Sequence, residues 1–212
     1  MRLDQIGNPA ARNRNEPQPV AAFMRIATIG AGNIGGTLGD TWTKAGHQVV
    51  YGLRDPSKRK DAKPIDQALA GAEVVLLAIP ASATVEFVRE HAEGLQGKII
   101  IDATNDFRAA KFNSWPELTT AVPTAQLYRA FNTLGWDVFA NPLVGGVQAD
   151  HFYCGPDGRG REVIEELITD AGLRPIWVGG VDQVDTVDGL LRIWAVLSRT
   201  RGRRIAFKLI SD

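Results

Sequence analysis

A glycine-rich turn that follows a short apolar run constrains the fold of this chain more than any other feature. The run from Ile26 to Ile29 leads into Gly30-Ala31-Gly32-Asn33-Ile34-Gly35, and a helical pattern begins there. In a strand–turn–helix unit of this kind, the first glycine allows the tight turn, the second lets a phosphate approach the backbone, and the third lets the helix lie against the strand. The N–H groups at the helix start favour an anion. The spacing therefore predicts a site for a dinucleotide pyrophosphate at Gly30, Ala31, Gly32, Asn33, Ile34 and Gly35.

The end of the next apolar run indicates which dinucleotide the site would take. Gln48 to Tyr51 is the expected second strand, and Gly52-Leu53-Arg54-Asp55 follows it. Sites for NAD usually place Asp or Glu at this strand end to hold the ribose 2′-hydroxyl, whereas an Arg nearby accommodates the 2′-phosphate of NADP. Arg54 therefore favours NADP(H). Two alternatives stay open, that Asp55 pairs with Arg54 or that Asp55 binds the ribose itself.

Short apolar runs alternate with helical patterns from Met24 onward, which is typical of a parallel sheet with helices on both faces. The patterns predict strands near 25–30, 48–52, 73–79, 98–103, 126–131, 151–154 and 175–178. They predict helices near 33–45, 64–70, 82–93 and 161–171, with room for one more in the irregular segment 106–123. The predicted fold is an α/β, Rossmann-type doubly wound and mostly parallel sheet with a small C-terminal helical annex.

Charge and composition narrow the classes of partner. Lys and Arg together number 24, as do Asp and Glu, so no excess of positive charge favours nucleic acid. The single cysteine, Cys154, excludes an intrachain disulfide and fits a reducing cytoplasm, where we expect this protein. No apolar run approaches the roughly 20 residues that span a bilayer, so no membrane partner is expected.

Three further strand ends are expected at the carboxyl edge of the sheet, where ligands of open parallel sheets bind. They are Ile79-Pro80-Ala81, Thr104-Asn105 and Asn132-Thr133-Leu134. Pro80 exposes no N–H and is a candidate wall against the nicotinamide, while the Asn and Thr side chains offer groups that orient a carboxamide or a substrate oxygen. Turn formation or helix capping is an equally good explanation for each Asn and Thr taken alone.

The proton donor that a carbonyl reductase needs is hard to find in this sequence. His47 follows a helix-ending glycine, His91 lies on the polar side of a helix, and His151 opens a late strand. The scattered histidines and one cysteine also lack the spacing of metal ligands. A flavin-type ring accepts a hydride without such an acid, because the protein mainly holds two rings together. The missing acid favours a flavin-type acceptor.

Composition divides the chain into three expected parts. Residues 1–23 are polar or proline-rich without periodicity, and we expect a disordered N-terminal tail. Residues 24–155 are expected to form the Rossmann NADP-binding domain, and residues 156–212 a C-terminal α/β annex that completes the acceptor site. A terminal helix from Val187 carries a wide apolar face, which either packs on the protein's own sheet or forms the seam of a homodimer. The arginines between Arg199 and Arg204 are expected to form a solvated helix end rather than a polyanion site.

The ordered series of these motifs resembles the NADPH-dependent reductases of the deazaflavin coenzyme F-420, and the related oxidoreductase domain of six-transmembrane ferric reductases. The resemblance extends over nearly everything from Met24 to Ile210. Besides the glycine turn, it rests on residues 52–56, Ile79-Pro80, 97–105, 130–133, 171–175 and the closing segment 203–209.

The resemblance implies that NADPH lies over the glycine turn, with Arg54 holding its 2′-phosphate, and that a hydride passes directly to a flavin or deazaflavin. It also implies that Pro80, Asn132, Thr133 and Leu134 form the floor between the two rings, so no residue need act as a proton-transferring catalyst. The chain departs from the family where Asp185-Thr186-Val187-Asp188 stands in place of an Arg followed by a Glu, and where Leu53 replaces a serine. These departures bear more on the identity of the acceptor than on the binding of NADPH.

Two other functions remain open at this point. The same glycine turn would serve a non-catalytic NADP(H)-binding redox sensor that binds a partner protein. A pyrroline-carboxylate or hydroxyacid reductase is disfavoured, because such enzymes carry a longer all-helical second domain. The leading prediction is an NADPH-dependent oxidoreductase that acts on a small-molecule flavin or deazaflavin acceptor as a homodimer.

Overall fold

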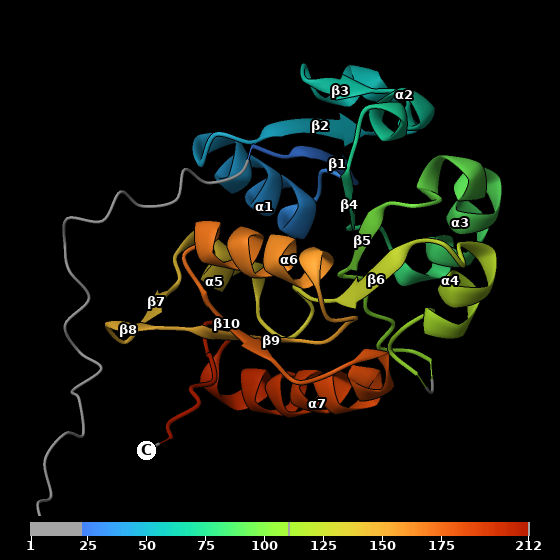
Figure 1. The fold of residues 1–212 in the computed structure, drawn as a ribbon. Helices are drawn as coiled ribbons and strands as arrows, with labels where there is room; N and C mark the ends of the chain where they lie inside the picture. Colours follow the sequence, from blue (N-terminus) through green and yellow to red (C-terminus); the bar gives the residue numbers. More distant parts are fainter. Residues whose placement is uncertain (1–22, 110, 212) are drawn as a thin grey trace, which may run out of the picture.

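The computed structural model describes residues 23–109 and 111–211, and its centre is a six-stranded parallel sheet (Figure 1). The order along the sheet is β3-β2-β1-β4-β5-β6, so the direction of winding reverses between β1 and β4. The predicted fold class is confirmed, and residues 1–22 of the expected tail lie outside the described residues. The six strands are β1 (Arg25–Ile29), β2 (Gln48–Gly52), β3 (Ala62–Lys63), β4 (Val74–Leu77), β5 (Ile99–Asp102) and β6 (Gln126–Arg129).

Helices cover both faces of this sheet, which is why its inner strands are mostly apolar on both faces instead of alternating with polar residues. Successive residues of a strand point to opposite faces, so Ile26 and Leu76 pack on one side while Ile29 and Leu77 pack on the other. The helices of the first face are α1 (Asn33–Lys44), α5 (Trp136–Ala140) and α6 (Arg159–Asp170), and those of the second are α2 (Ile65–Ala70), α3 (Ala81–Leu95) and α4 (Trp115–Ala121).

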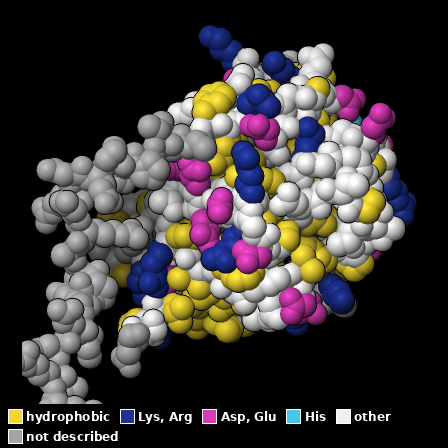
Figure 2. Space-filling model, viewed as in Figure 1, with side chains coloured by type: hydrophobic (Ala, Val, Ile, Leu, Met, Phe, Trp, Pro, Cys, Tyr) yellow, Lys and Arg dark blue, Asp and Glu magenta, His cyan; other side chains and the backbone are white. Residues whose placement is uncertain are grey.

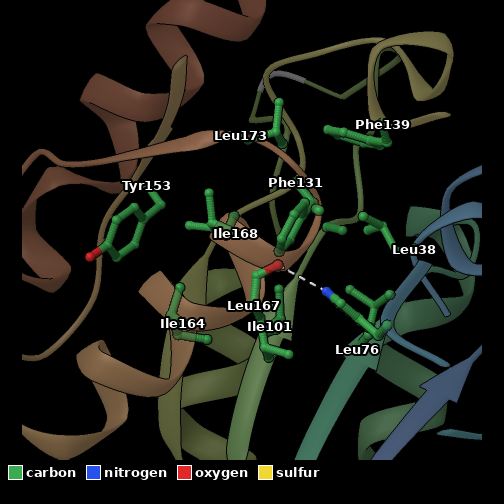
Figure 3. Packing of buried hydrophobic residues seen from close by; sticks show 14 of the residues in the cluster. Leu38, Leu76, Ile101, Phe131, Phe139, Tyr153, Ile164, Leu167, Ile168 and Leu173 are labelled. Atoms are coloured by element: carbon green, nitrogen blue, oxygen red, sulfur yellow. Dashed lines mark hydrogen bonds between the residues drawn. The ribbon is translucent and has the colours of Figure 1, made fainter. Parts of the chain in front are cut away.

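The first face holds the larger part of the core. Figure 3 shows Leu38 of α1 and Leu167 of α6 pointing toward Leu76 and Ile101 of the sheet. The indole of Trp42, which is fully buried, donates a hydrogen bond of 2.9 Å to the carbonyl oxygen of Leu167. This bond joins α1 to α6, and so ties the helix that begins at the glycine turn to the C-terminal part of the chain.

The last two predicted strands form a small sheet of their own. β9 (Asp150–Tyr153) and β10 (Arg174–Trp177) pair in parallel with each other, and a bridge between Arg129 and Cys154 connects β9 to the end of β6. Helix α7 (Val184–Arg201) lies along this pair (Figure 1). The strands were therefore predicted within one residue, but their separation from the central sheet was not.

Several short elements escaped the sequence patterns. The antiparallel hairpin of β7 (Leu143–Val144) and β8 (Val147–Gln148) turns at Gly145 and Gly146, whose φ angles are +60° and +80°. A Gly-Gly pair between two apolar residues is the usual signal of such a turn, and it could have located this hairpin. β3 has two residues and α5 five, too few to show a period.

The apolar face of α7 divides into a covered part and an exposed part. Val187, Leu191 and Trp194 are buried against the protein's own fold, while the side chains of Ile193 and Val196 are 50% and 64% exposed. Figure 2 shows hydrophobic side chains gathered over the lower part of the molecule, where α7 lies. Packing on the protein's own fold thus accounts for part of the predicted face, and the homodimer stays a prediction that sedimentation would test.

Asp150 fastens the C-terminal segment to β9. Its fully buried carboxylate accepts hydrogen bonds from Arg174 Nε (2.8 Å), Lys208 Nζ (2.7 Å) and the backbone N–H of Leu209 (2.6 Å). Burial alone would raise the pKa of Asp150, but these bonds outweigh it and lower the pKa to about 2. A carboxyl with a lowered pKa stabilises the fold above the unfolded pKa of about 4, and this stabilisation is lost as the pH falls from about 4 to about 2.

We expect Asp150→Asn to lower the free energy of unfolding at neutral pH by about 1–2 kcal/mol, allowing for the partial exposure of Arg174 and Lys208. The variant should also lose much of the decline in stability below about pH 4. Urea titrations at a series of pH values measure both effects. Asp157→Asn changes an exposed carboxylate and serves as the control. A pH profile unchanged in Asp150→Asn would mean that other carboxyl groups cause the acid sensitivity.

Candidate functional site

The glycine turn joins β1 to α1 at the point where the strand order reverses. Gly30 has a φ of +98°, and a Cβ atom there would lie 2.5 Å from the carbonyl oxygen of Ala78. A Cβ atom at Gly35 would collide with the carbonyl oxygen of Gly30. Backbone atoms leave no room for a side chain at either position, so these two glycines allow the tight turn and the close helix packing that their spacing predicts.

Gly32 faces open space. A Cβ atom there would meet no heavy atom within 4 Å, and the residue is exposed. Gly32 caps α1 without a side-chain hydrogen bond, and the first helical bond runs from Gly36 N to Gly32 O at 2.7 Å. The N–H groups of Asn33 and Ile34 precede that bond and are therefore of the kind that binds anions at helix starts. The turn offers an unobstructed approach to these N–H groups.

A pocket of about 330 Å³ extends from the glycine turn to the end of β2. Its apolar walls come from Ile65, Ile79 and Phe87, on α2, the end of β4 and α3. Gly30 and Arg54 also line it, and Arg54 supplies the guanidinium of the lining. The pocket thus combines apolar walls, the first glycine of the turn and the positive charge of Arg54, with Glu86 and Glu90 also in its lining.

Arg54 is the cation of this loop that is available to a ligand in the pocket. It is exposed and makes no hydrogen bond or ion pair with any residue that the structure describes. Arg59, by contrast, contacts both Asp40 and Asp61, and its guanidinium lies 3.7 Å from the centre of the Tyr51 ring. The charge of Arg59 is therefore already balanced within the protein.

Asp55 is engaged by its own turn. Its Oδ1 accepts hydrogen bonds from Ser57 Oγ (2.6 Å) and Ser57 N (3.2 Å), which hold the pKa of Asp55 below its usual range. The pairing of Asp55 with Arg54 that the sequence left open is not found. The second alternative, a ribose bound by Asp55, would have to share a carboxylate oxygen that caps this turn.

Part of the pocket lining was missed by the sequence analysis. Glu86, Phe87, Glu90 and His91 of α3 all line the pocket, and His91 Nδ1 lies 2.6 Å from Asp66 Oδ1. These residues recur at helical spacing after the strand end at Ile79-Pro80-Ala81, which was the available signal. Periodicity alone does not say which face of a helix turns toward a ligand.

The residues predicted at the other strand ends differ in their exposure. Pro80 is exposed and Ala81 half-buried at the start of α3. Thr104 is buried, and its Oγ1 donates to Asp102 Oδ1 at 2.6 Å. Asn105 is half-buried, and its Nδ2 donates to the backbone oxygen of Asn132 at 3.3 Å. The ends of β5 and β6 thus meet through Asn105, which carries the contact toward the surface.

Asn132, Thr133 and Leu134 lie deeper than the resemblance implies. Their exposed fractions are 1%, 0% and 4%. Of the four residues expected between the two rings, Pro80 alone has an exposed side chain. The other three residues would affect the rings indirectly, by positioning Asn105 or by shaping the loop beneath it.

A buried ionic network behind Asn105 was not anticipated from the sequence. Arg129 is fully buried, with its Nη1 3.0 Å from Asp102 Oδ2 and its Nη2 2.9 Å from Asp188 Oδ1. Arg129 Nη2 also donates to Asn105 Oδ1 (3.0 Å), and Asn132 Nδ2 donates to Asp188 Oδ1 (3.2 Å). The network ties the ends of β5 and β6 to α7. The missed signal was a charged residue within a buried strand, because a buried arginine requires a carboxylate partner.

The histidines do not supply a proton donor at these strand ends. His47 precedes β2 and contacts Asp170, and His91 lies in the pocket beside Asp66. His151 is fully buried, and burial lowers its pKa to about 3. The backbone N–H of Phe131 donates to His151 Nε2 at 2.7 Å, so this neutral ring has no free Nε2 to offer a ligand.

No group of three or more His, Cys, Asp or Glu side chains within residues 23–109 and 111–211 could hold a metal ion. No helix in that part of the chain is long and apolar enough to cross a membrane.

Comparison with known proteins shows that the part of the chain around the glycine turn is similar to a known family. Residues 25–106 match the model of the family described as NADP oxidoreductase, coenzyme F-420-dependent. The resemblance inferred from the sequence is confirmed over these residues. They contain the turn and the pocket, from β1 to the segment just after β5.

Solved structures share the fold over nearly the whole chain. A protein of Arthrobacter sp. FB24 that has been assigned as an F-420-dependent NADP reductase is 24% identical, with a TM-score of 0.78, and covers 89% of this chain and 100% of its own. The hypothetical protein SMa0349 of Sinorhizobium meliloti is 26% identical, with a TM-score of 0.64, and covers 90% and 97%.

A curated relative matches over a shorter stretch. Glycerol-3-phosphate dehydrogenase [NAD(P)+] of Pseudomonas savastanoi pv. phaseolicola is 25% identical over 48% of this chain. The match spans only 37% of the length of that dehydrogenase. Together, the family match and this relative connect the chain with NAD(P)-dependent oxidoreductases.

Proposed function

Because residues 25–106 match the NADP oxidoreductase family, we propose that this protein is an NADPH-dependent oxidoreductase that transfers a hydride between NADP(H) and a flavin or deazaflavin acceptor such as coenzyme F-420. The observation that carries the proposal is the open approach to the start of α1, near a pocket lined by Arg54, which pairs with none of the described residues. The distant dehydrogenase relatives support the proposed use of NAD(P), and the family match supports the proposed flavin-type acceptor.

The pocket suits the adenosine half of the cofactor. Ile65, Ile79 and Phe87 provide apolar walls for the adenine, and the N–H groups behind Gly32 would bind the pyrophosphate. Arg54 would hold the 2′-phosphate, because its guanidinium lines the pocket and has no partner among the described residues. Bound NADPH supplies the hydride from C4 of its nicotinamide, and the acceptor takes it together with a proton from water.

The carboxyl ends of β4 and β5 would hold the nicotinamide. Pro80 is exposed and has no N–H donor. Asn105 is half-buried and joins the ends of β5 and β6 through its hydrogen bond to Asn132. We further propose that residues 156–212 complete the acceptor side, because Asp188 of α7 bonds to Asn132. The described residues at these strand ends, 79–81, 104–105 and 132–134, include no His, Lys or Tyr, which suits a ring that needs no proton from the protein.

An acceptor panel tests the proposal directly. We expect the purified protein to oxidise NADPH when F-420, FMN or FAD is supplied, with NADPH preferred to NADH by tenfold or more, on the order of one charge-assisted contact. Absorbance measured anaerobically follows both nicotinamide and acceptor. Tight binding of NADPH without turnover on any acceptor would instead support the redox sensor, and a lack of binding would contradict both functions.

A further inference from the structure

The buried network around Arg129 has more negative than positive charge. Asp188 accepts hydrogen bonds from Arg129, from Asn132 and from Asn113, whose Nδ2 lies 2.7 Å from Asp188 Oδ2. Asp102 accepts from Arg129 and from a neighbouring backbone N–H and hydroxyl. The network therefore holds two aspartates, each of formal charge −1, and a single guanidinium that balances one of them. A net charge of about −1 is left in a region less than 5% exposed.

The neighbouring groups leave this charge uncompensated. Arg192 lies one helical turn beyond Asp188, but it is exposed, with its guanidinium 4.9 Å from the centre of the Phe112 ring. Burial raises the pKa of the Cys154 thiol to about 12, so this neighbour is neutral. Among the described residues, no Lys or Arg other than Arg129 bonds to either carboxylate.

The network lies close enough to the carboxyl edge of the sheet for its charge to act on a ligand bound there. Arg129 contacts the half-buried Asn105 at the carboxyl edge of the sheet, and the two carboxylates come from the end of β5 and from α7. A buried charge without a counter-charge is costly, and a cation at the edge of the same low-dielectric region recovers part of that cost. Fixed charges that meet a developing charge of opposite sign favour the step that produces it.

Resting on the proposed function, we infer that the Asp102–Arg129–Asp188 network stabilises the positively charged oxidised nicotinamide over the neutral reduced ring, and so favours NADPH as the hydride donor. In that direction the C4–H bond breaks, both electrons leave with the hydride to the flavin-type acceptor, and the nicotinamide becomes positive. The acceptor gains its proton from water. The three charged residues act at a distance, through electrostatics, and touch neither ring.

Calorimetry with NADP⁺ and NADPH tests this role without turnover. Asp188→Asn removes the excess charge and nearly keeps the shape. We expect it to weaken NADP⁺ relative to NADPH by roughly tenfold, the size of one nearby unit charge at the effective dielectric constant of a protein. Should circular dichroism show that this variant fails to fold, Asp102→Asn makes the same neutralisation on the other side of Arg129 and should give the same shift.

A charge-swap variant is the matched control. Combining Asp188→Asn with Asn113→Asp moves the carboxylate to the adjacent side chain, to which the amide at position 188 can donate a hydrogen bond. The affinity for NADP⁺ relative to NADPH should then return toward that of the native protein. An unchanged ratio in a folded neutralised variant that binds both cofactors would overturn the inference. If the native protein binds neither cofactor, the proposed function fails instead.

Discussion

Gly32→Val is expected to abolish the binding of NADPH and NADH alike, because a valine side chain would fill the space through which the pyrophosphate reaches the start of α1. The native space is empty, with no heavy atom within 4 Å of a Cβ atom at this position. The backbone of Gly32 is extended, with φ −73° and ψ −165°, which valine also adopts. The fold should therefore persist while the ligand is excluded.

The expected loss is at least about 3 kcal/mol, or more than 100-fold in affinity, since several charge-assisted hydrogen bonds would be lost together. Titration calorimetry with each cofactor measures it, and thermal unfolding checks the fold. Gly71→Val is the matched control, because Gly71 also has open space around its Cβ position and lies outside the pocket. Normal NADPH binding by folded Gly32→Val would place the pyrophosphate elsewhere.

Arg54→Ala is expected to weaken NADPH by about 1.5–3 kcal/mol, roughly tenfold to 150-fold, while leaving NADH nearly unchanged. The reason is the 2′-phosphate, which only NADPH carries, and which Arg54 can bind without first breaking a bond to any of the described residues. Because Arg54 is exposed, added salt should reduce the difference between the two cofactors.

Calorimetric titrations of both cofactors at two salt concentrations measure this selectivity. Arg89→Ala removes another exposed arginine of the second face, one that lies outside the pocket, and should change neither affinity. An equal loss for NADPH and NADH in Arg54→Ala would refute the role in phosphate recognition, since a contact to a group shared by both cofactors would then explain the effect.

The strand–turn–helix unit was predictable because everything that defines it is local. A side chain at Gly35 would collide with the backbone of Gly30, and one at Gly30 would collide with the backbone of Ala78 at the end of the adjoining strand. The spacing of these glycines in the sequence therefore predicts the turn. The periodic runs likewise placed the longer strands and α1, α3 and α6 within a few residues. The family match over residues 25–106 extends this local pattern.

The remainder of the site depends on residues that only the tertiary structure brings together. Arg129 and Asp188 lie 59 residues apart, yet they form one buried ion pair. The sequence also did not predict which face of α3 carries Phe87 into the pocket. Nor did it predict that β9 and β10 form a sheet apart from the central one, because a buried strand shows the same apolar pattern whichever strand it pairs with. The sequence by itself determined where a dinucleotide phosphate can meet backbone N–H groups. Tertiary packing decided which charges surround it, because burial and pairing are properties of contacts distant along the chain.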